Sequence, residues 1–205
     1  MSIYSEKILP HLIHCACTTK DVMHMREKVV PQAYGCVLEV GMGSGINFPL
    51  YDKTKVEFVW GLEPSAGMRK KGRRNIDSAS IDVKIINLPG AEIPLDDASV
   101  DTVLLTYALC TIPDWNSALR QMYRVLKPEG KLLFCEHGLA PDSQVRKWQD
   151  RLNPIWKRVA GGCNMNRPIR NQIEHGRFKI EEIETDYEEN SPRVLGYTYI
   201  GQACR

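Results

Sequence analysis

The sequence predicts an α/β fold in which helices cover both faces of a mainly parallel sheet. Short apolar runs with strand spacing alternate with longer segments whose apolar residues recur at helical spacing. The run Val100–Thr106 is almost continuously apolar, as a strand buried on both faces requires. The first apolar run leads into the glycine-rich turn Gly41–Gly45, which is typical of a strand that delivers the chain to a ligand-binding loop.

The amino-terminal half is expected to hold a helical arm and three strands. Residues 1–30 mix apolar and polar positions at helical spacing, until Pro31 and Gly35 interrupt the pattern. Strands are expected at Cys36–Val40, Val56–Leu62 and Val83–Ile86, with a short helical segment at Asn47–Tyr51 and a helix that starts at Pro64 and Ser65.

The carboxyl-terminal half continues the alternation and then changes. The expected elements are the strand Val100–Thr106, the helix Asn116–Leu126, a turn at Lys127–Gly130, the strand Lys131–Glu136, a helix at 141–160 bent near Pro154, a break at Gly161–Pro168, a helix to about His175, and strands at about 177–187 and 194–204. The helix at 141–160 exceeds what a minimal crossover needs. Residues 138–168 are therefore a candidate insertion that covers the substrate, with a purely structural insertion as an equal alternative.

Length and composition favour one domain, residues 1–205, in a reducing compartment. Lys and Arg number 27 and Asp and Glu 25, a formal charge of +2, which gives no reason to expect a nucleic-acid partner. The basic run Met68–Arg74 is expected to be the solvated face of a helix. The seven cysteines form no paired framework, and no apolar window is long enough for a membrane span. We therefore expect a soluble, cytoplasmic protein without stable membrane insertion or an obligatory protein partner.

The glycine turn fits neither of two familiar nucleotide loops. The nicotinamide fingerprint has the spacing G-x-G-x-x-G, whereas Gly41, Gly43 and Gly45 follow G-x-G-x-G and position 46 is Ile. A phosphate-binding P-loop needs Gly-Lys followed by Ser or Thr, which is missing. A purely structural tight turn remains the alternative to a ligand site.

Several motifs together resemble one enzyme family. They are Glu39–Gly45, the strand-terminal Glu63, Gly90–Leu95 followed by Ser99–Asp101, and Arg124–Phe134. In this order, over about residues 36–136, they resemble class I S-adenosylmethionine-dependent methyltransferases. The resemblance implies a Rossmann-like, seven-stranded, mainly parallel sheet with a C-terminal antiparallel strand.

Three further segments narrow the resemblance. Cys135–Gly138, the helix containing Trp148–Trp156, and Gly161–Asn164 are similar to the alkyl-thiol methyltransferases, and more distantly to the ubiquinone and menaquinone C-methyltransferases. Membrane-associated thiol enzymes carry an apolar amino-terminal anchor that this sequence does not show.

The resemblance implies a set of contacts to S-adenosylmethionine. They are Glu39, Gly41, Gly43, Gly45, Glu63, Pro64, Gly90, Ala91, Glu92, Thr106 and Tyr107. In that family a carboxylate such as Glu63 accepts hydrogen bonds from the ribose hydroxyls, and an acid such as Glu39 lies near the ammonium group. The alternatives are a solvated acid at Glu63 and a structural hydrogen bond at Glu39. Many relatives have Asp where Gly90 stands, so the adenine contact is expected from backbone atoms.

Glu136 and His137 are the catalytic candidates, because active sites in open parallel sheets gather at the carboxyl edge. A structural histidine is the alternative for His137, and Cys110 and Cys163 are interpreted as small apolar residues. The amino-terminal His11, His14, Cys15, Cys17 and His24 match no closed zinc site, so no metal is assigned.

The acceptor is expected to be small and fairly apolar, with a thiol favoured since it ionises readily. After the expected strand Val100–Thr106, amide and nucleobase methyltransferases carry Asn or Asp followed by Pro-Pro-aromatic. This sequence has Thr106–Cys110 there instead, which argues against an amide or a nucleobase amino group as acceptor. The alternatives are C- or O-methylation of a quinone-like or lipid precursor, and a noncatalytic S-adenosylmethionine-binding protein.

Overall fold

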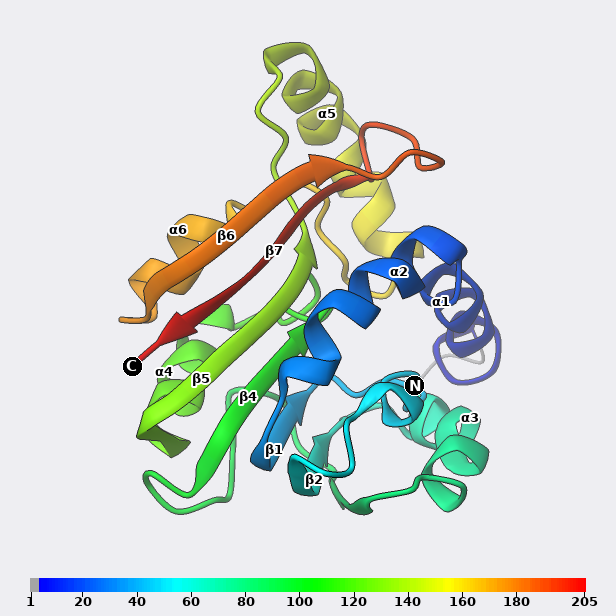
Figure 1. The fold of residues 1–205 in the computed structure, drawn as a ribbon. Helices are drawn as coiled ribbons and strands as arrows, with labels where there is room; N and C mark the ends of the chain where they lie inside the picture. Colours follow the sequence, from blue (N-terminus) through cyan, green and yellow to red (C-terminus); the bar gives the residue numbers. More distant parts are fainter. Residues whose placement is uncertain (1–3) are drawn as a thin grey trace.

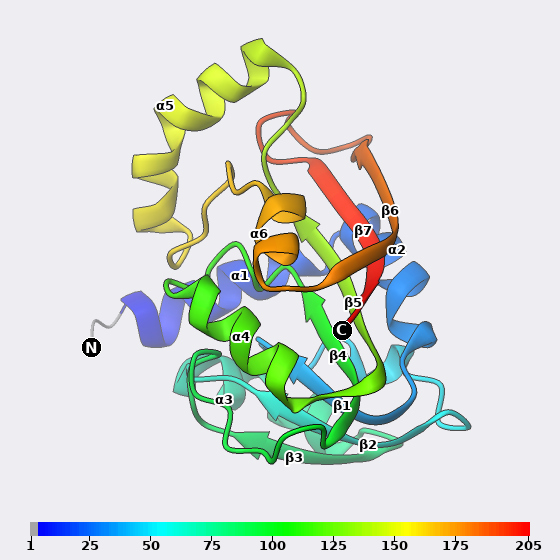
Figure 2. The same ribbon diagram turned by 90° about the vertical axis from the view of Figure 1, so that its left-hand side faces the viewer.

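The computed structural model describes residues 4–205, and its strands form a seven-stranded sheet in the order β3-β2-β1-β4-β5-β7-β6 (Figure 1; β3 is labelled in Figure 2). The strands are β1 (Gly35–Val40), β2 (Val56–Leu62), β3 (Asp82–Ile86), β4 (Val100–Thr106), β5 (Leu126–His137), β6 (Lys179–Tyr187) and β7 (Tyr197–Cys204). Strands β1 to β5 pair in parallel, whereas β7 is antiparallel to both β5 and β6. The predicted fold class and its antiparallel C-terminal strand are confirmed.

The helices lie on both faces of this sheet (Figure 2). They are α1 (Leu9–Cys17), α2 (Lys20–Val29), α3 (Ala66–Asp77), α4 (Trp115–Val125), α5 (Ser143–Val159) and α6 (Ile169–His175), with a π-helical turn at Tyr4–Ile8 and 3-10 turns at Val30–Gln32 and Phe48–Leu50. Apolar residues of α4 and α6 share one buried cluster with strand residues such as Leu105 and Phe134. The end of α2 and the 3-10 turn at Phe48 share the other cluster, with Leu104 and Leu133.

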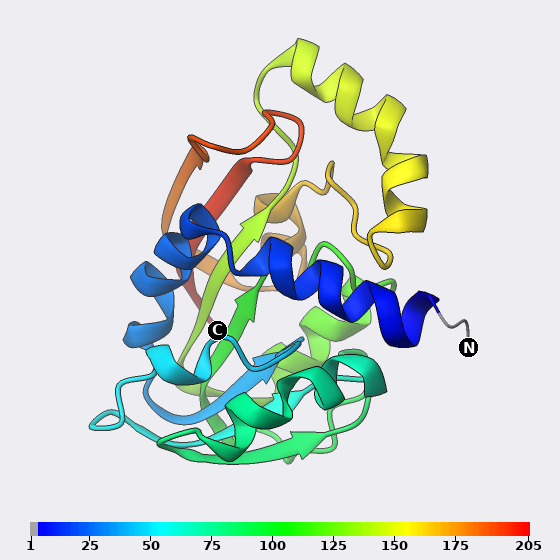
Figure 3. The same cartoon turned by 90° about the vertical axis from the view of Figure 1, so that its right-hand side faces the viewer.

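The amino-terminal arm is two helices rather than one. Helix α1 ends at Cys17, and α2 begins after Thr19, whose backbone is extended. Figure 3 shows α1 crossing the carboxyl ends of the central strands, while α2 turns down along the face of the sheet. The break matters because it lets one segment cover the strand ends and the next one join the core.

Strand β5 starts earlier than the predicted turn at Lys127–Gly130 allows. Val100 of β4 pairs with Leu126, and Thr102 pairs with Lys131, so the four residues between them bulge out of the ladder. The turn is thus a bulge inside β5.

The helix after β2, α3, begins at Ala66, just after the predicted start at Pro64 and Ser65. Ser65 is its N-cap, and its hydroxyl accepts a hydrogen bond from the Met68 N–H at 3.3 Å. Pro64 therefore stands just before the cap rather than within the first turn.

The helix at 143–159 runs through Pro154. Within the described residues, no helix is long and apolar enough to cross a membrane.

Candidate active site

A cavity of about 360 Å³ opens at the carboxyl edge of the parallel strands, a volume in the range of small-ligand pockets. Its walls come from the glycine turn, the end of β2, the loop after β3, the end of β4 and helix α1. Of the residues expected to bind the cofactor, seven line it: Gly41, Gly43, Glu63, Pro64, Gly90, Thr106 and Tyr107. Glu39, Gly45, Ala91, Glu92, Glu136 and His137 are not among the lining residues.

The glycine turn is built from residues with positive φ. The φ angles of Gly41, Gly43 and Gly45 are +74°, +58° and +67°, a region that side-chain-bearing residues rarely adopt. A Cβ on Gly41 would also lie 2.6 Å from the Ala108 Cβ, so this glycine lets the turn pass close to the end of β4. Gly45 serves the turn itself, because a Cβ there would meet the Phe48 ring at 2.5 Å.

Glu63 faces the glycine turn from the end of β2. Its Oε2 accepts a hydrogen bond from the Gly43 N–H at 3.0 Å, and its Oε1 accepts one from the Ser65 N–H at 2.8 Å. Burial raises the pKa of this carboxyl above its ordinary value, although the two backbone N–H groups counteract the rise. The backbone thus orients the carboxylate on the cavity wall, and each oxygen keeps a second lone pair for a ligand hydroxyl.

Glu39 lies behind the cavity wall, 1% exposed, one residue before the end of β1. It accepts hydrogen bonds from Tyr51 Oη at 2.7 Å and from Asn47 Nδ2 at 2.9 Å. Burial raises the pKa of Glu39 to about 7, against the lowering effect of these hydrogen bonds and of Arg26. These contacts favour a structural hydrogen-bonding role for Glu39. Its partners are the side chains of Tyr51 and Asn47, where a loop amide was the expected partner.

Arg26 is the site residue that sequence reasoning missed. It lies on α2, is 5% exposed and lines the cavity. Its Nη1 donates to Asn47 Oδ1 and to Thr106 Oγ1, each at 2.7 Å, whereas its buried Nε–H has no hydrogen-bond partner among the described residues. The available signal was an arginine on the apolar side of a helix, since Val22, Arg26 and Val29 are the buried residues of α2.

The loop after β3 places Pro89 and Gly90 in the cavity lining, and a Cβ on Gly90 would lie 3.4 Å from Ile112 Cδ1, which lines the cavity too. The chain turns away directly afterwards, because the Glu92 N–H donates to the Pro89 carbonyl oxygen at 2.9 Å. Glu92 is exposed and Ala91 is not a lining residue. This part of the cavity wall is therefore made of backbone atoms and apolar side chains, and Gly90 contributes no side chain to it.

Glu136, at the end of β5, is fully buried beneath the loop that follows β4. Its Oε1 accepts hydrogen bonds from the Ala108 and Leu109 N–H groups at 2.7 and 2.9 Å, and its Oε2 accepts one from the Cys110 N–H at 3.3 Å. Burial raises the pKa of this carboxyl. These contacts fit an anchor for the loop better than the proton acceptor expected from the sequence.

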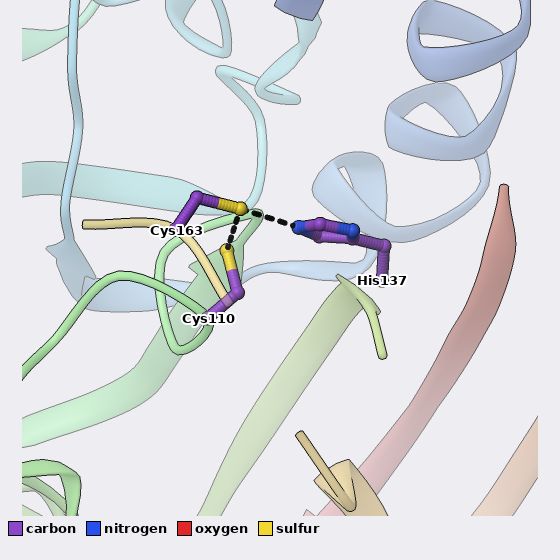
Figure 4. Close-up of side chains that lie close together, drawn as sticks. All are labelled: Cys110, His137 and Cys163. Atoms are coloured by element: carbon purple, nitrogen blue, oxygen red, sulfur yellow. Dashed lines mark hydrogen bonds between the residues drawn. The ribbon is translucent and has the colours of Figure 1, made fainter. Parts of the chain in front are cut away.

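His137 lies beside two cysteines that the sequence does not bring together. Its Nε2 is 3.1 Å from Cys163 Sγ, which is 3.8 Å from Cys110 Sγ (Figure 4). The Cys110 thiol and His137 lower the pKa of Cys163, with Cys110 the larger cause, and burial raises it. The net effect is a pKa below the ordinary range of a thiol. Burial alone would lower the pKa of His137, but the Cys163 sulfur outweighs it and raises the pKa to about 9.

Helix α1 is the main cover of the cavity, to which it contributes Leu9, Pro10, Ile13 and Cys17. It is fixed to the glycine turn by a hydrogen bond of 2.8 Å between His14 Nδ1 and Ser44 Oγ. The segment 138–168, expected as the substrate cover, supplies only Gly161 to the lining. A Cβ on Gly161 would lie 3.0 Å from Leu9 Cδ2, so this segment packs on α1 at the cavity rim.

Comparisons with known sequences agree with this geometry. A family model described as "Methyltransferase domain" matches residues 38–134. The chain is 33% identical over 153 residues to the Rattus norvegicus protein named Thiol S-methyltransferase TMT1B. This alignment covers 72% of this chain and 62% of the rat protein. The chain is 29% identical over 183 residues to the Homo sapiens protein named Thiol S-methyltransferase TMT1A, which covers 85% and 74%. A Listeria welshimeri demethylmenaquinone methyltransferase is 41% identical over 102 residues, which is 49% of this chain and 42% of that one. The chain thus spans less than two thirds of the rat relative.

Solved structures share the fold at low sequence identity. An S-adenosylmethionine-dependent methyltransferase from Mesorhizobium loti superposes with a TM-score of 0.64 at 17% identity, over 92% of this chain and 99% of that one. The [4+2]-cyclase SpnF superposes with a TM-score of 0.68 at 16% identity, over 90% and 80%. The strand order, the glycine turn, the acid at the end of β2 and the family match agree with one another: the chain carries a methyltransferase domain of the class I, Rossmann-like fold.

Proposed function

We propose that this protein binds S-adenosylmethionine in the cavity at the carboxyl edge of the sheet and transfers its methyl group to a thiol. The observation that carries the proposal is the placement of Glu63, the glycine turn and Arg26 in the lining of one cavity. These groups suit a ligand with a ribose diol at one end and an amino acid at the other.

Glu63 supports the ribose contact. Its two oxygens are held in place by the Gly43 and Ser65 N–H groups, and the remaining lone pairs accept hydrogen bonds from two neighbouring hydroxyls. Pro89, Gly90 and Ile112 then form the apolar surface for the adenine ring.

Arg26 supports the contact to the donor carboxylate. Arg26 places a buried guanidinium on the cavity lining, and a carboxylate bound beside this cation would form a charge-assisted hydrogen bond with it. Thr106 lies beside it and accepts from Arg26 and from Asn47, so its own hydroxyl hydrogen is free to point at the amino-acid end. Glu39 has an indirect role, because it accepts a hydrogen bond from Asn47 and so positions the side chain that donates to Thr106.

The acceptor is inferred from the weakness of the bases in the cavity. The ionisable lining residues are Cys17, Arg26, Glu63 and Tyr107. Burial raises the pKa of Cys17 and of Tyr107, so both stay protonated near neutrality, and Glu63 is assigned to the ribose. An acceptor that loses its own proton readily suits this site, because transfer from a sulfonium needs mainly an aligned nucleophile. A thiol, with a pKa near 8.5, meets that requirement better than an alcohol.

The comparisons support a thiol acceptor over a quinone-like one. The match to the human thiol S-methyltransferase extends over more residues than the methyltransferase domain contains, so it includes segments outside the donor half. The match to the demethylmenaquinone methyltransferase covers only about half of the chain. The free cysteines of the described residues suit the reducing cytoplasm as the site of action.

Two measurements test the proposal in sequence. S-adenosylhomocysteine should raise the melting temperature and NAD should not; stabilisation by NAD alone would contradict the donor assignment. Labelled S-adenosylmethionine is then offered with an alkyl thiol, a phenol and a reduced quinone. Methylation of the thiol is the expected result. Turnover of the phenol or quinone alone would favour the C- or O-methyltransferase alternative, and donor binding without any turnover would favour a noncatalytic binding protein.

A further inference from the structure

Cys110, His137 and Cys163 converge from three separate segments of the chain. Cys110 lies in the loop after β4, His137 is the last residue of β5, and Cys163 follows the glycines after α5. All three are buried, and their sulfur and nitrogen atoms lie within 4.8 Å of one another, pointing at a common centre (Figure 4). The proposed donor site uses none of them.

The spacing of these atoms suits a tetrahedral metal ion. With zinc–sulfur bonds of about 2.3 Å and zinc–nitrogen bonds of about 2.0 Å, two thiolates on one ion lie about 3.8 Å apart and a thiolate and an imidazole about 3.5 Å apart. The observed separations are 3.8 Å between the two sulfurs and 3.1 Å between His137 Nε2 and Cys163 Sγ. Two cysteines and one histidine also form a donor set that zinc prefers.

We propose that Cys110, His137 and Cys163 bind one Zn²⁺ ion, and that its fourth coordination position takes the sulfur of the acceptor thiol. Three protein ligands with an open fourth position are the pattern of catalytic zinc sites, whereas structural zinc sites are closed by four. Two thiolates balance the charge of the ion, so the buried site is electrically neutral. The second half of the proposal rests on the proposed thiol methylation.

The residues next to each ligand fix the three segments to one another. Glu136 precedes His137, and its Oε2 accepts the Cys110 N–H at 3.3 Å. Asn164 follows Cys163, and both its backbone N–H and its Nδ2 donate to the Cys110 carbonyl oxygen, each at 3.0 Å. Such support around the ligands is what keeps a metal site in a single geometry.

The cluster borders the proposed donor cavity. Thr111 and Gly161 line that cavity, one position after Cys110 and two positions before Cys163. Tyr107 lines it as well, and its ring centroid is 6.2 Å from that of His137. A sulfur held at the open position of the zinc ion thus lies beside the part of the cavity that Thr106 and Tyr107 line.

The chemistry balances without another reactant. The acceptor R–SH binds zinc as a thiolate and releases its proton to solvent. The sulfur lone pair then attacks the methyl carbon, a new carbon–sulfur bond forms, and the methyl–sulfonium bond breaks, with its electron pair going to the sulfur of S-adenosylhomocysteine. The neutral thioether R–S–CH₃ is a weaker zinc ligand than a thiolate and dissociates.

The metal site is tested on the full chain without donor or acceptor. Reduced protein is stripped with a chelator, titrated with Zn²⁺ and analysed for bound metal by mass spectrometry. One equivalent should bind. Cys110→Ser, Cys163→Ser and His137→Gln should each weaken binding more than about 100-fold, while Cys15→Ser, at an exposed cysteine, retains it. Binding of S-adenosylhomocysteine by each variant checks that it is folded.

Co²⁺ in place of Zn²⁺ tests the fourth position. Sulfur-to-cobalt charge-transfer absorption should appear in wild type and increase when an alkyl thiol, but not its methyl thioether, is added. Reduced wild type that binds no zinc, or equal binding by the three variants, would overturn the site. Zinc binding with no change on adding thiol would overturn the acceptor role. Thiol methylation unchanged by the chelator would also overturn that role and leave the proposed function standing. Zinc binding without any methylation would contradict the proposed function and, with it, the acceptor role, and would leave only the metal site standing.

Discussion

Arg26 of α2 donates a hydrogen bond to Thr106 at the end of β4 over 2.7 Å, which joins two segments 80 positions apart. The guanidinium also lies 5.2 Å from the centre of the Tyr107 ring. The amino-terminal arm is therefore part of the cavity, and its contribution to ligand binding can be measured separately from that of the sheet.

Replacement of Arg26 by Met should weaken S-adenosylhomocysteine binding roughly 10- to 100-fold, the range expected for one charge-assisted hydrogen bond. Isothermal titration provides the measurement. A decarboxylated analogue should bind wild type and variant alike, since it lacks the group that Arg26 contacts. Arg73→Met on the exposed face of α3 is the matched control. Equal weakening for both ligands would indicate general damage to the fold.

Glu63→Gln should weaken S-adenosylhomocysteine binding roughly 10-fold, because an amide NH₂ faces a backbone N–H or a ribose hydroxyl where the carboxylate accepted from both. An analogue without the ribose hydroxyls should bind the variant and the wild type equally well. Glu57→Gln, an exposed acid on the same strand, serves as the control. Unchanged affinity for S-adenosylhomocysteine in the Glu63 variant would rule out the ribose contact.

Glu39 should make the protein less stable as pH rises toward neutrality. Burial raises its pKa to about 7 in the folded chain, so between about pH 4.5 and pH 7 the folded state holds a proton that the unfolded chain has released. The contribution of Glu39 to the free energy of unfolding should therefore fall by about 2 to 3 kcal/mol from pH 5 to pH 8, and level off above the folded pKa.

Urea titrations at pH 5 and pH 8 measure this effect. Glu39→Gln should reduce the difference between the two pH values by about 2 to 3 kcal/mol, whereas Glu57→Gln should leave it unchanged. An identical difference in the Glu39 variant and in wild type would assign the pH dependence to other groups.

Gln149 should prove essential for holding α5 to the body of the protein. It is fully buried, accepts from the Ala140 N–H at 3.0 Å, and donates to the carbonyl oxygens of Gly138 and Met165 at 3.0 and 2.8 Å. Gln149→Met keeps the side-chain volume but leaves the Ala140 N–H and the two carbonyl oxygens without this hydrogen-bond partner. The free energy of unfolding in urea should therefore drop by about 3 kcal/mol. Lys147→Met, on the exposed side of the same helix, should change it little. A similar loss in both variants would contradict the hydrogen-bond explanation.

Strand and helix positions were largely predictable because burial leaves a local pattern. The apolar run Val100–Thr106 and the alternation in Val56–Leu62 are both strands in the structure, with the predicted bounds. Glu63 was predictable for the same reason, since an acid directly after a strand must lie at the sheet edge. The turn at Lys127–Gly130 was placed correctly in the chain, but the pairing that makes it a bulge depends on β4.

Site residues that act through distant partners were not predictable. Nothing near Glu136 in the sequence shows that its carboxylate meets the N–H groups of Ala108 and Leu109. Cys163 and His137 lie 26 positions apart, and no spacing rule brings their side chains together. Hydrophobic periodicity reports which face of an element is buried, but not what that face meets.

The sheet order has a consequence for how the polypeptide matures. Strand β7 separates β5 from β6, although it is the last of the three in the chain. As the nascent chain leaves the ribosome, β6 emerges with no neighbour to pair with, and β5 has an unpaired edge. The edges of β5 and β6 can pair with strands of other chains until β7 is synthesised and inserts between them. Aggregation is therefore most favoured at this stage of translation, which is when a chaperone would protect the chain most.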